Sequence, residues 1–228
     1  MMVLAIALAL LDCVPVLFLG LGLFFLAQLV DRLDPRSRRV ALSGFALILL
    51  GAFANASSNL LLAFSGPDVP LLEAMPYVFG GPGFVLMASS LLRCRASVRG
   101  RTVRRDPWIM PTLISWAFLL TGLYLNSAGQ PGAWKALLGV LGLLGTLTLG
   151  FAAADLGLRR QLHVAALLFA FMMASSTTLL VLQSITFQPV LIQLFEAVLS
   201  IAAQAAFAFG SWRVAAEYRA RIGPTAPE

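Results

Sequence analysis

Long apolar runs constrain this chain more than any other feature of its sequence. Seven stretches are almost free of charge and are apolar on every face rather than at alternate positions. A helix needs about 20 such residues to cross the hydrocarbon core of a bilayer, whereas a barrel strand alternates every second residue. Because the 228 residues hold these stretches and little else, the sequence predicts an all-α integral membrane protein, a single seven-helix domain over 1–228.

Basic residues orient the predicted helices. The spans cover about 4–30, 40–64, 70–92, 108–126, 134–157, 161–183 and 188–213. All fifteen arginines follow spans one, three, five or seven, and the other loops carry only Lys135. By the positive-inside rule, the N-terminus lies outside and the C-terminus in the cytoplasm. We therefore expect a multi-pass protein of the plasma membrane, or of the inner membrane in a bacterium.

The charged and sulfur-bearing residues narrow the function classes. The net charge of +6 comes from short arginine clusters between spans, which predicts contact with anionic lipid headgroups and not with nucleic acid. Cys13 and Cys94 fall on opposite sides of the predicted membrane, so they cannot pair. With one histidine and two separate cysteines, no zinc site, bis-histidine haem or other cofactor is expected. No catalytic motif is present, so we do not expect an enzyme.

Three short correspondences favour an internal repeat. Residues 55–58 read Asn-Ala-Ser-Ser and 173–176 read Met-Ala-Ser-Ser, an offset of 118. Glu-Ala recurs at 73 and 196, an offset of 123, and Asp with two following arginines recurs at 34 and 155, an offset of 121. Their common order favours a 3+1+3 parallel plan, with halves 4–92 and 134–213 linked by span 108–126. Chance similarity between apolar helices is the competing explanation.

In layout alone, this plan resembles the SWEET sugar transporters. That family has a proline in each of the first two helices of each half, whereas here span one has Pro15 but spans two, five and six have none in their interiors. Seven spans with an outside N-terminus also resemble the microbial rhodopsins. Their retinal needs a lysine in span seven, and this chain has none there, which excludes a retinal Schiff base.

Span three contains a segment that is poor in helix-forming residues. Residues 76–84 read Pro-Tyr-Val-Phe-Gly-Gly-Pro-Gly-Phe. Proline removes a backbone donor and clashes with the preceding turn, and glycine lowers helix stability. Irregular backbone within a membrane persists only where protein or a cavity covers it. We expect a hinge at Gly80, Gly81, Pro82 and Gly83, near the midplane and beneath an outward-facing pocket; a plain packing kink is the alternative.

Polar side chains within the spans gather in their predicted outer half. Each such group in hydrocarbon is costly and should face a partner or a cavity. The candidate ligand-binding residues are Asn55, Ser58, Asn59, Thr178, Gln183 and Glu196. Asn55 and Asn59 are four residues apart and share a helix face, and Glu196 is a candidate proton carrier or partner for a cationic group. Asp12, Glu73 and Asn126 are interpreted as headgroup-level residues.

These features support two classes of function. The first is a transporter or permease-like carrier of a small molecule or lipid, with a site between spans two, three, six and seven. The second is a non-transporting sensor or a structural subunit of a larger membrane complex, because polar residues do not continue through the predicted inner half. A homo-oligomer and a partner membrane protein both remain open.

Overall fold

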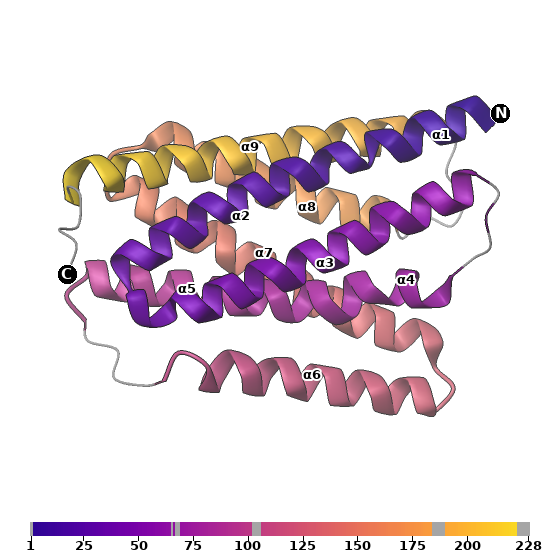
Figure 1. Cartoon of the computed structure of the whole chain (residues 1–228), viewed down its shortest axis with the longest axis horizontal. Coiled ribbons are helices and arrows are strands. Elements are labelled where there is room, and N and C mark those ends of the chain that lie inside the picture. The colour runs from indigo at the N-terminus through magenta and orange to yellow at the C-terminus, as the bar shows by residue number, and fades with distance from the viewer. Residues whose placement is uncertain (1, 65, 67–68, 102–105, 184–189, 223–228) are drawn as a thin grey trace.

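A computed structural model describes residues 2–64, 66, 69–101, 106–183 and 190–222 of the chain. Its helices lie side by side along the long axis of the molecule (Figure 1). In chain order they are α1 Met2–Leu11, α2 Cys13–Leu33, the 3-10 turn η1 Pro35–Ser37, α3 Arg38–Ala63, α4 Pro70–Met75, the π-helical turn η2 Pro76–Gly80, α5 Gly81–Val98, α6 Ile109–Ser127, α7 Pro131–Leu158, α8 His163–Gln183 and α9 Val190–Ile222.

Within the described residues, seven helical stretches are long and apolar enough to cross a membrane. They cover Ala9–Leu33, Pro35–Ala63, Pro70–Val98, Ile109–Ser127, Gly132–Leu158, His163–Leu182 and Leu191–Arg221. The prediction of an all-α chain with seven such helices is therefore confirmed for this part of the chain, which contains no strand.

Two spans extend farther than their hydropathy predicted. The third was expected to end near Leu92 but continues as helix to Val98, and the seventh was expected to end near Arg213 but continues to Ile222. Both extensions carry arginines that pair with acidic side chains, Arg95 with Asp155 and Arg221 with Glu217. Hydropathy marks where the apolar run ends, and polar pairing then carries the helix beyond that point.

Six of the long helices form a closed ring. α2 packs against α3, α3 against α5, α5 against α7, α7 against α8, and α8 against α9, which returns to pack along α2. α6 stands outside this ring and packs on α7 and α5, at the lower edge of the view in Figure 1. This order places α3 and α5 on one side of the ring and α8 and α9 on the other.

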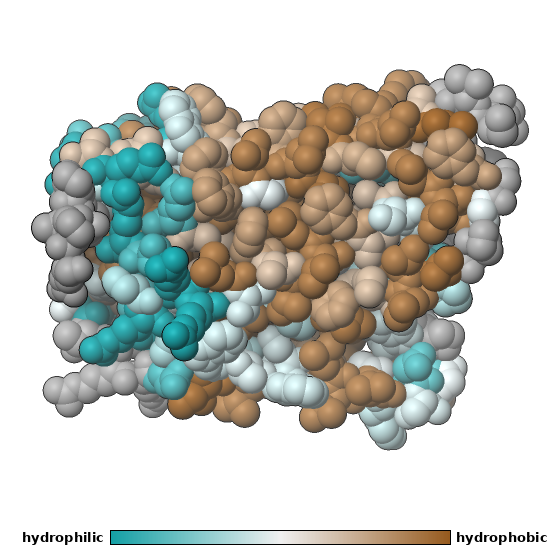
Figure 2. Space-filling view, viewed as in Figure 1, coloured by the Kyte–Doolittle hydropathy of each residue, from teal (hydrophilic) through white to brown (hydrophobic). Residues whose placement is uncertain are grey.

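The apolar core is concentrated toward one end of the ring. Its fully buried members come from the C-terminal halves of α2, α5 and α7, from the N-terminal halves of α3 and α8, and from the later part of α9; they include Leu26, Ile48, Leu91, Leu156, Phe169, Phe207 and Tyr218. This is the end at which the arginines lie, and we call it the arginine-rich end. Figure 2 shows the hydrophilic residues gathered there, with apolar surface over most of the remaining length.

Buried polar contacts fasten the arginine-rich end. Arg93 of α5 donates from Nε to the Asp34 carboxylate at 3.1 Å and to the Ser37 hydroxyl at 2.9 Å, and Ser37 itself donates to Asp34 at 2.7 Å. Asp155 of α7 accepts from Arg95 of α5 at 2.9 Å. These side chains are largely shielded from solvent, so their charges are paired as burial requires.

Arg99 and Arg159 also donate to Asp155, so the carboxylate collects arginines from α5 and from its own helix. Arg95 further stacks over the Phe151 ring at 5.0 Å. The two clusters together hold α5 to the α2–α3 corner and to α7. Arg104 and Arg105, which also follow the third predicted span, lie outside the described residues.

Glycine lets α5 approach both of its neighbours closely. A Cβ added at Gly44 of α3 would lie 2.8 Å from the carbonyl oxygen of Gly83, and one added at Gly145 of α7 would lie 2.7 Å from the Cβ of Phe84. Both crossings therefore depend on the missing side chain, as is common where membrane helices associate.

We predict that Gly145→Val destabilises the bundle by about 1–3 kcal/mol, because the added methyl groups force α7 away from α5. Gly132→Val is the matched control, since a Cβ at that position of the same helix meets nothing within 4 Å. Thermal unfolding of the purified protein in detergent measures the difference. Equal unfolding temperatures for the two variants would contradict the close α5–α7 crossing.

Candidate functional site

The proline- and glycine-rich segment forms a widened helical turn and not an unwound loop. Residues 76–80 are π-helical, and regular α-helix resumes at Gly81 and continues through Pro82. Proline at 76 and at 82 removes two backbone donors and crowds the carbonyl four residues before each, and a wider turn relieves that crowding. Single π-turns of this kind occur frequently at functional sites.

A cavity of about 320 Å³ lies against this turn. Its walls come from α3, from η2 and the start of α5, from α7 and from one residue of α2; the lining residues are Leu19, Ile48, Gly51, Ala52, Asn55, Pro76, Tyr77, Gly80, Gly81, Phe84, Leu138, Gly139 and Gly142. Measured along span three from the start of α4 toward the arginine-rich end, Tyr77 lies at about 10 Å and Phe84 at about 20 Å, with a rise of 1.5 Å per residue. The cavity thus extends from the half opposite the arginines toward the midplane.

Two polar side chains, Asn55 and Tyr77, line this cavity. Asn55 is exposed on α3, and within the described part of the chain its amide makes no hydrogen bond to protein. Tyr77 is half-buried, and its ring meets Trp134 of α7 edge to face at 6.0 Å. An amide at this depth without a protein partner needs water or a ligand to satisfy it, because hydrocarbon offers neither donor nor acceptor.

Glycine forms much of the remaining wall. Gly139, Gly142 and Gly145 recur at every third position of α7, and Gly145 packs against α5. Gly139 and Gly142, however, also line the cavity, and a Cβ at Gly139 would come no closer than 3.9 Å to Tyr77. At Gly80 a Cβ would meet nothing within 4 Å, so this residue borders open space.

Asn59, one turn along α3 from Asn55, is held by a different contact. Its Nδ2 donates to the Asp12 carboxylate at 2.9 Å, which ties α3 to the junction of α1 and α2. Asp12 was interpreted as a headgroup-level residue, and the structure places it in this hydrogen bond. Ser58 is buried on the same helix. Neither Ser58 nor Asn59 lines the cavity at η2.

The other predicted site residues lie on the far side of the ring. Thr178 is exposed on α8 and donates its hydroxyl to the carbonyl of Ala174 at 3.0 Å. Glu196 is half-buried on α9, and the side chain of Gln183 lies outside the described part of the structure. Neither Thr178 nor Glu196 lines the Asn55 cavity, whose described walls include no residue of α8 or α9.

The described lining of the cavity includes no charged side chain. Glu73, one turn before η2, pairs with Lys135 of α7 at 3.3 Å and stands at the same end of the bundle. Among the described residues, no group of three or more His, Cys, Asp or Glu side chains could hold a metal ion. The site therefore offers an amide, a phenol ring and helix backbone, which suit an uncharged molecule with hydrogen-bonding groups.

Sequence reasoning identified Asn55 and the unusual segment but did not bring them together. Tyr77 was missed as a lining residue, although it lies inside that segment. The signal that could have found it is the pair of prolines at 76 and 82, which favours a π-turn, opposite a polar face of the neighbouring helix.

The arrangement defines a multi-pass helical membrane protein with a neutral polar cavity in one half of its bundle. Comparison of the chain with protein-family models, with curated proteins and with solved structures finds no match in any of the three. The functional argument therefore rests on the site itself.

We predict that Gly80→Ala unfolds at a higher temperature than Gly51→Ala. Both changes gain the same intrinsic helix propensity, up to about 1 kcal/mol, so the difference reports crowding. A Cβ at Gly80 enters the open cavity, whereas one at Gly51 would lie 3.3 Å from both the Gly80 nitrogen and the Pro76 Cα. Thermal unfolding in detergent measures the order, and the reverse order would contradict the placement of the cavity.

Proposed function

We propose that this protein is a carrier that moves a small uncharged polar molecule, or the polar part of a lipid, through a site at Asn55. The observation that carries the proposal is the Asn55 amide, which lies in a membrane-level cavity without a protein partner, beside a π-turn. A site for binding alone needs the cavity. A carrier also needs an element that can change shape, and the π-turn supplies a candidate.

The proposed orientation places the cavity toward the outside. The arginines at the opposite end favour the cytoplasm by the positive-inside rule, which puts the N-terminus outside and the protein in the plasma membrane, or in the inner membrane of a bacterium. The closed core and ion pairs at the arginine-rich end then correspond to a shut inner gate. In this state a ligand reaches Asn55 from outside.

A 3+1+3 repeat is part of the proposal, and two contacts between the halves support it. Gly22 of α2 lies against Phe207 of α9, and Gly145 of α7 lies against Phe84 of α5. Position 145 is 123 residues after 22, and 207 is 123 residues after 84, so each contact maps onto the other when the halves are exchanged. A two-fold relation between α2–α5 and α7–α9, with α6 as the linker, produces this exchange.

A contact within each half agrees. A Cβ at Gly44 would lie 2.9 Å from the Met87 nitrogen, and one at Gly210 would lie 3.5 Å from the Ala165 oxygen. The offsets are 121 for the pair 44 and 165 and 123 for the pair 87 and 210. The Asn-Ala-Ser-Ser correspondence has an offset of 118, about one helical turn from 121, so the contacts place the second and sixth spans in a slightly different register.

The π-turn is the proposed hinge, together with Gly80, Gly81, Pro82 and Gly83. Gly81 and Gly83 carry the close approaches of α5 to α7 and to α3. A change of pitch within η2 would move the start of span three relative to those fixed crossings and would open or close the cavity. The related part of α9, around Gln204, contains neither proline nor glycine, so the proposal places the hinge in one half only.

A sensor or a structural subunit is the competing function. It is favoured because the cavity lies in one half of the bundle only: its described lining includes no residue of the arginine-rich end. A sensor would bind its ligand at Asn55 and pass the change to a partner membrane protein.

We predict that Asn55→Leu and Gly80→Leu each reduce uptake into proteoliposomes at least tenfold, by removing the amide and by filling the cavity. Ser57→Leu is the matched control, since Ser57 is exposed on the same helix and does not line the cavity. A panel of sugars, polyols, amides and uncharged amino-acid derivatives supplies the substrates. If the parent protein moves none of them yet one stabilises it thermally through Asn55, the sensor is supported and the carrier is not.

Glu196 remains the proposed proton carrier, since it is a half-buried carboxylate on α9 within the membrane-spanning stretch. We expect Glu196→Gln to abolish the response of uptake to an imposed pH gradient while leaving exchange without a gradient. Glu217→Gln, on the same helix at the arginine-rich end, is the control. An unchanged pH response in Glu196→Gln would remove Glu196 from the mechanism without affecting the Asn55 site.

A further inference from the structure

A second cavity, of about 440 Å³, lies at the arginine-rich end. It opens where the α2–α3 corner, the end of α5 and the start of α6 meet, and its lining residues are Pro35, Arg36, Arg39, Arg93, Asp106, Pro107 and Trp108. Three arginines and one aspartate give this lining a positive charge. The N-terminal ends of α3 and α6 also lie at this cavity, and helix N-termini favour an anion.

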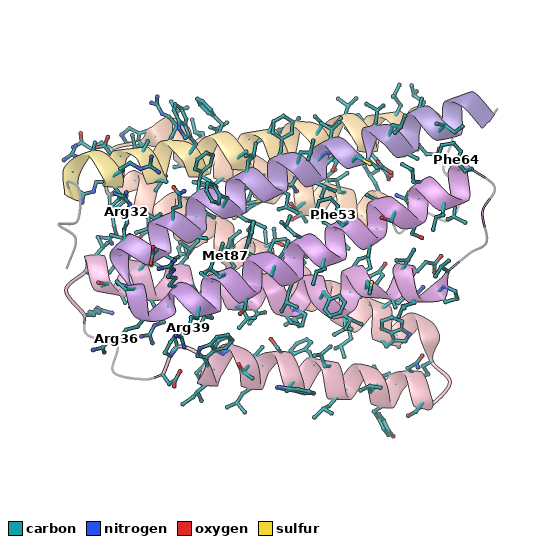
Figure 3. The ribbon with its side chains drawn as sticks, viewed as in Figure 1. Arg32, Arg36, Arg39, Phe53, Phe64 and Met87 are labelled. Carbon is teal, nitrogen blue, oxygen red and sulfur yellow. The ribbon has the colours of Figure 1, made fainter. Side chains whose placement is uncertain are left out.

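The three arginines of this cavity differ in whether an acidic side chain already pairs with them. Arg93 is paired with Asp34, and Asp106 accepts a hydrogen bond from the Trp108 backbone at 2.9 Å. Arg36 and Arg39 are exposed, and no ion pair to either is present in the described part of the chain. Arg36 and Arg39 lie near the start of α6, whereas Arg32 lies nearer α9 (Figure 3).

An apolar groove of about 330 Å³ adjoins the charged cavity, between α5, α6 and α7. Its lining residues are Val85, Ala88, Ser89, Leu92, Met110, Pro111, Ile114, Phe118, Leu141, Leu144, Gly145 and Thr148. The two hydroxyls among them already donate within their own helices, Ser89 to the Leu86 carbonyl at 2.8 Å and Thr148 to the Leu144 carbonyl at 2.7 Å. The groove therefore presents no free hydroxyl donor to a ligand.

The groove and the charged cavity follow one another along the same two helices. Leu92 in the groove precedes Arg93 in the cavity, and Trp108 in the cavity is two residues before Met110 in the groove. From Val85 to Leu92 the groove runs about 10 Å along α5. Charge thus gives way to an apolar slot at the level where a lipid headgroup gives way to its acyl chain.

We propose that these two cavities together form a binding site for one anionic phospholipid. Arg36 and Arg39 bind its phosphate-bearing headgroup, Trp108 lies at the level of the headgroup boundary, and one acyl chain occupies the groove between α6 and the ring. A free phosphate or a soluble phosphate ester would use the arginines but would leave the apolar groove empty. Charge complementarity and the adjoining apolar groove therefore favour a lipid.

The test is a titration of the full-length protein with phosphatidylglycerol or phosphatidylcholine in a neutral detergent, followed by native mass spectrometry. We expect one phosphatidylglycerol to be retained in preference to phosphatidylcholine. Arg36→Gln/Arg39→Gln should weaken its binding about thirty-fold, given the usual contribution of an arginine near anionic lipid. Arg36→Lys/Arg39→Lys keeps both charges and should restore most of the binding. That result would exclude misfolding as the cause of the weaker binding in the glutamine variant.

Arg32→Gln/Arg213→Gln is the matched control, since it removes two charges from the same end outside the cavity. Equal weakening by both glutamine pairs would overturn the site in favour of general surface attraction. Ser89→Phe, which fills the groove, should weaken binding of the phospholipid at least fivefold. Competition by glycerol phosphate as effective as that by phosphatidylglycerol, or an absence of preference over phosphatidylcholine, would overturn the lipid assignment. None of these results depends on whether Asn55 binds a transported molecule.

Discussion

Side chains from all six ring helices meet in a dry core at the arginine-rich end, and the rest of the bundle is organised from there. Leu26, Leu91, Leu156 and Phe207 are fully buried in it, and Asp34 and Asp155 close it with arginines from α5. Charges this shielded must be paired, and α5 supplies Arg93 to Asp34 and Arg95 to Asp155, which also pairs with Arg159. Because this end is fixed, looser packing in the other half leaves room for a cavity without loss of the fold.

The cavity and the π-turn both follow from the prolines within span three. Proline cannot complete a regular helix, and in a membrane the freed backbone groups need cover or a new partner. The wider turn at 76–80 meets part of that need, and the neighbouring glycines on α3 and α7 let helices approach without filling the space. What remains is an uncharged hollow with a single free amide. The surrounding crossings at Gly44 and Gly145 are tight, which is why the proposed hinge is placed within η2.

Hydropathy and arginine placement were enough to predict seven helices, because each apolar run must span the bilayer by itself. They could not predict the continuation of α5 to Val98, which carries the pairing of Arg95 with a residue sixty positions away. The ring order was equally inaccessible, so Asn55 and Glu196 were grouped in one site although the structure places them on opposite sides. Asn55 itself was found because an amide in an apolar helix is costly wherever it lies.

The closure of the ring has a consequence for how the protein is made. α2 and α9 form one of its most extensive contacts, and Gln28 accepts a 2.6 Å hydrogen bond from Arg219, 191 residues later. Among the described spans, α2 therefore meets its partner α9 only after the five spans between them have been made. Contacts of such long sequence separation form late. The contact that closes the ring is thus among the last that the bundle can complete during synthesis.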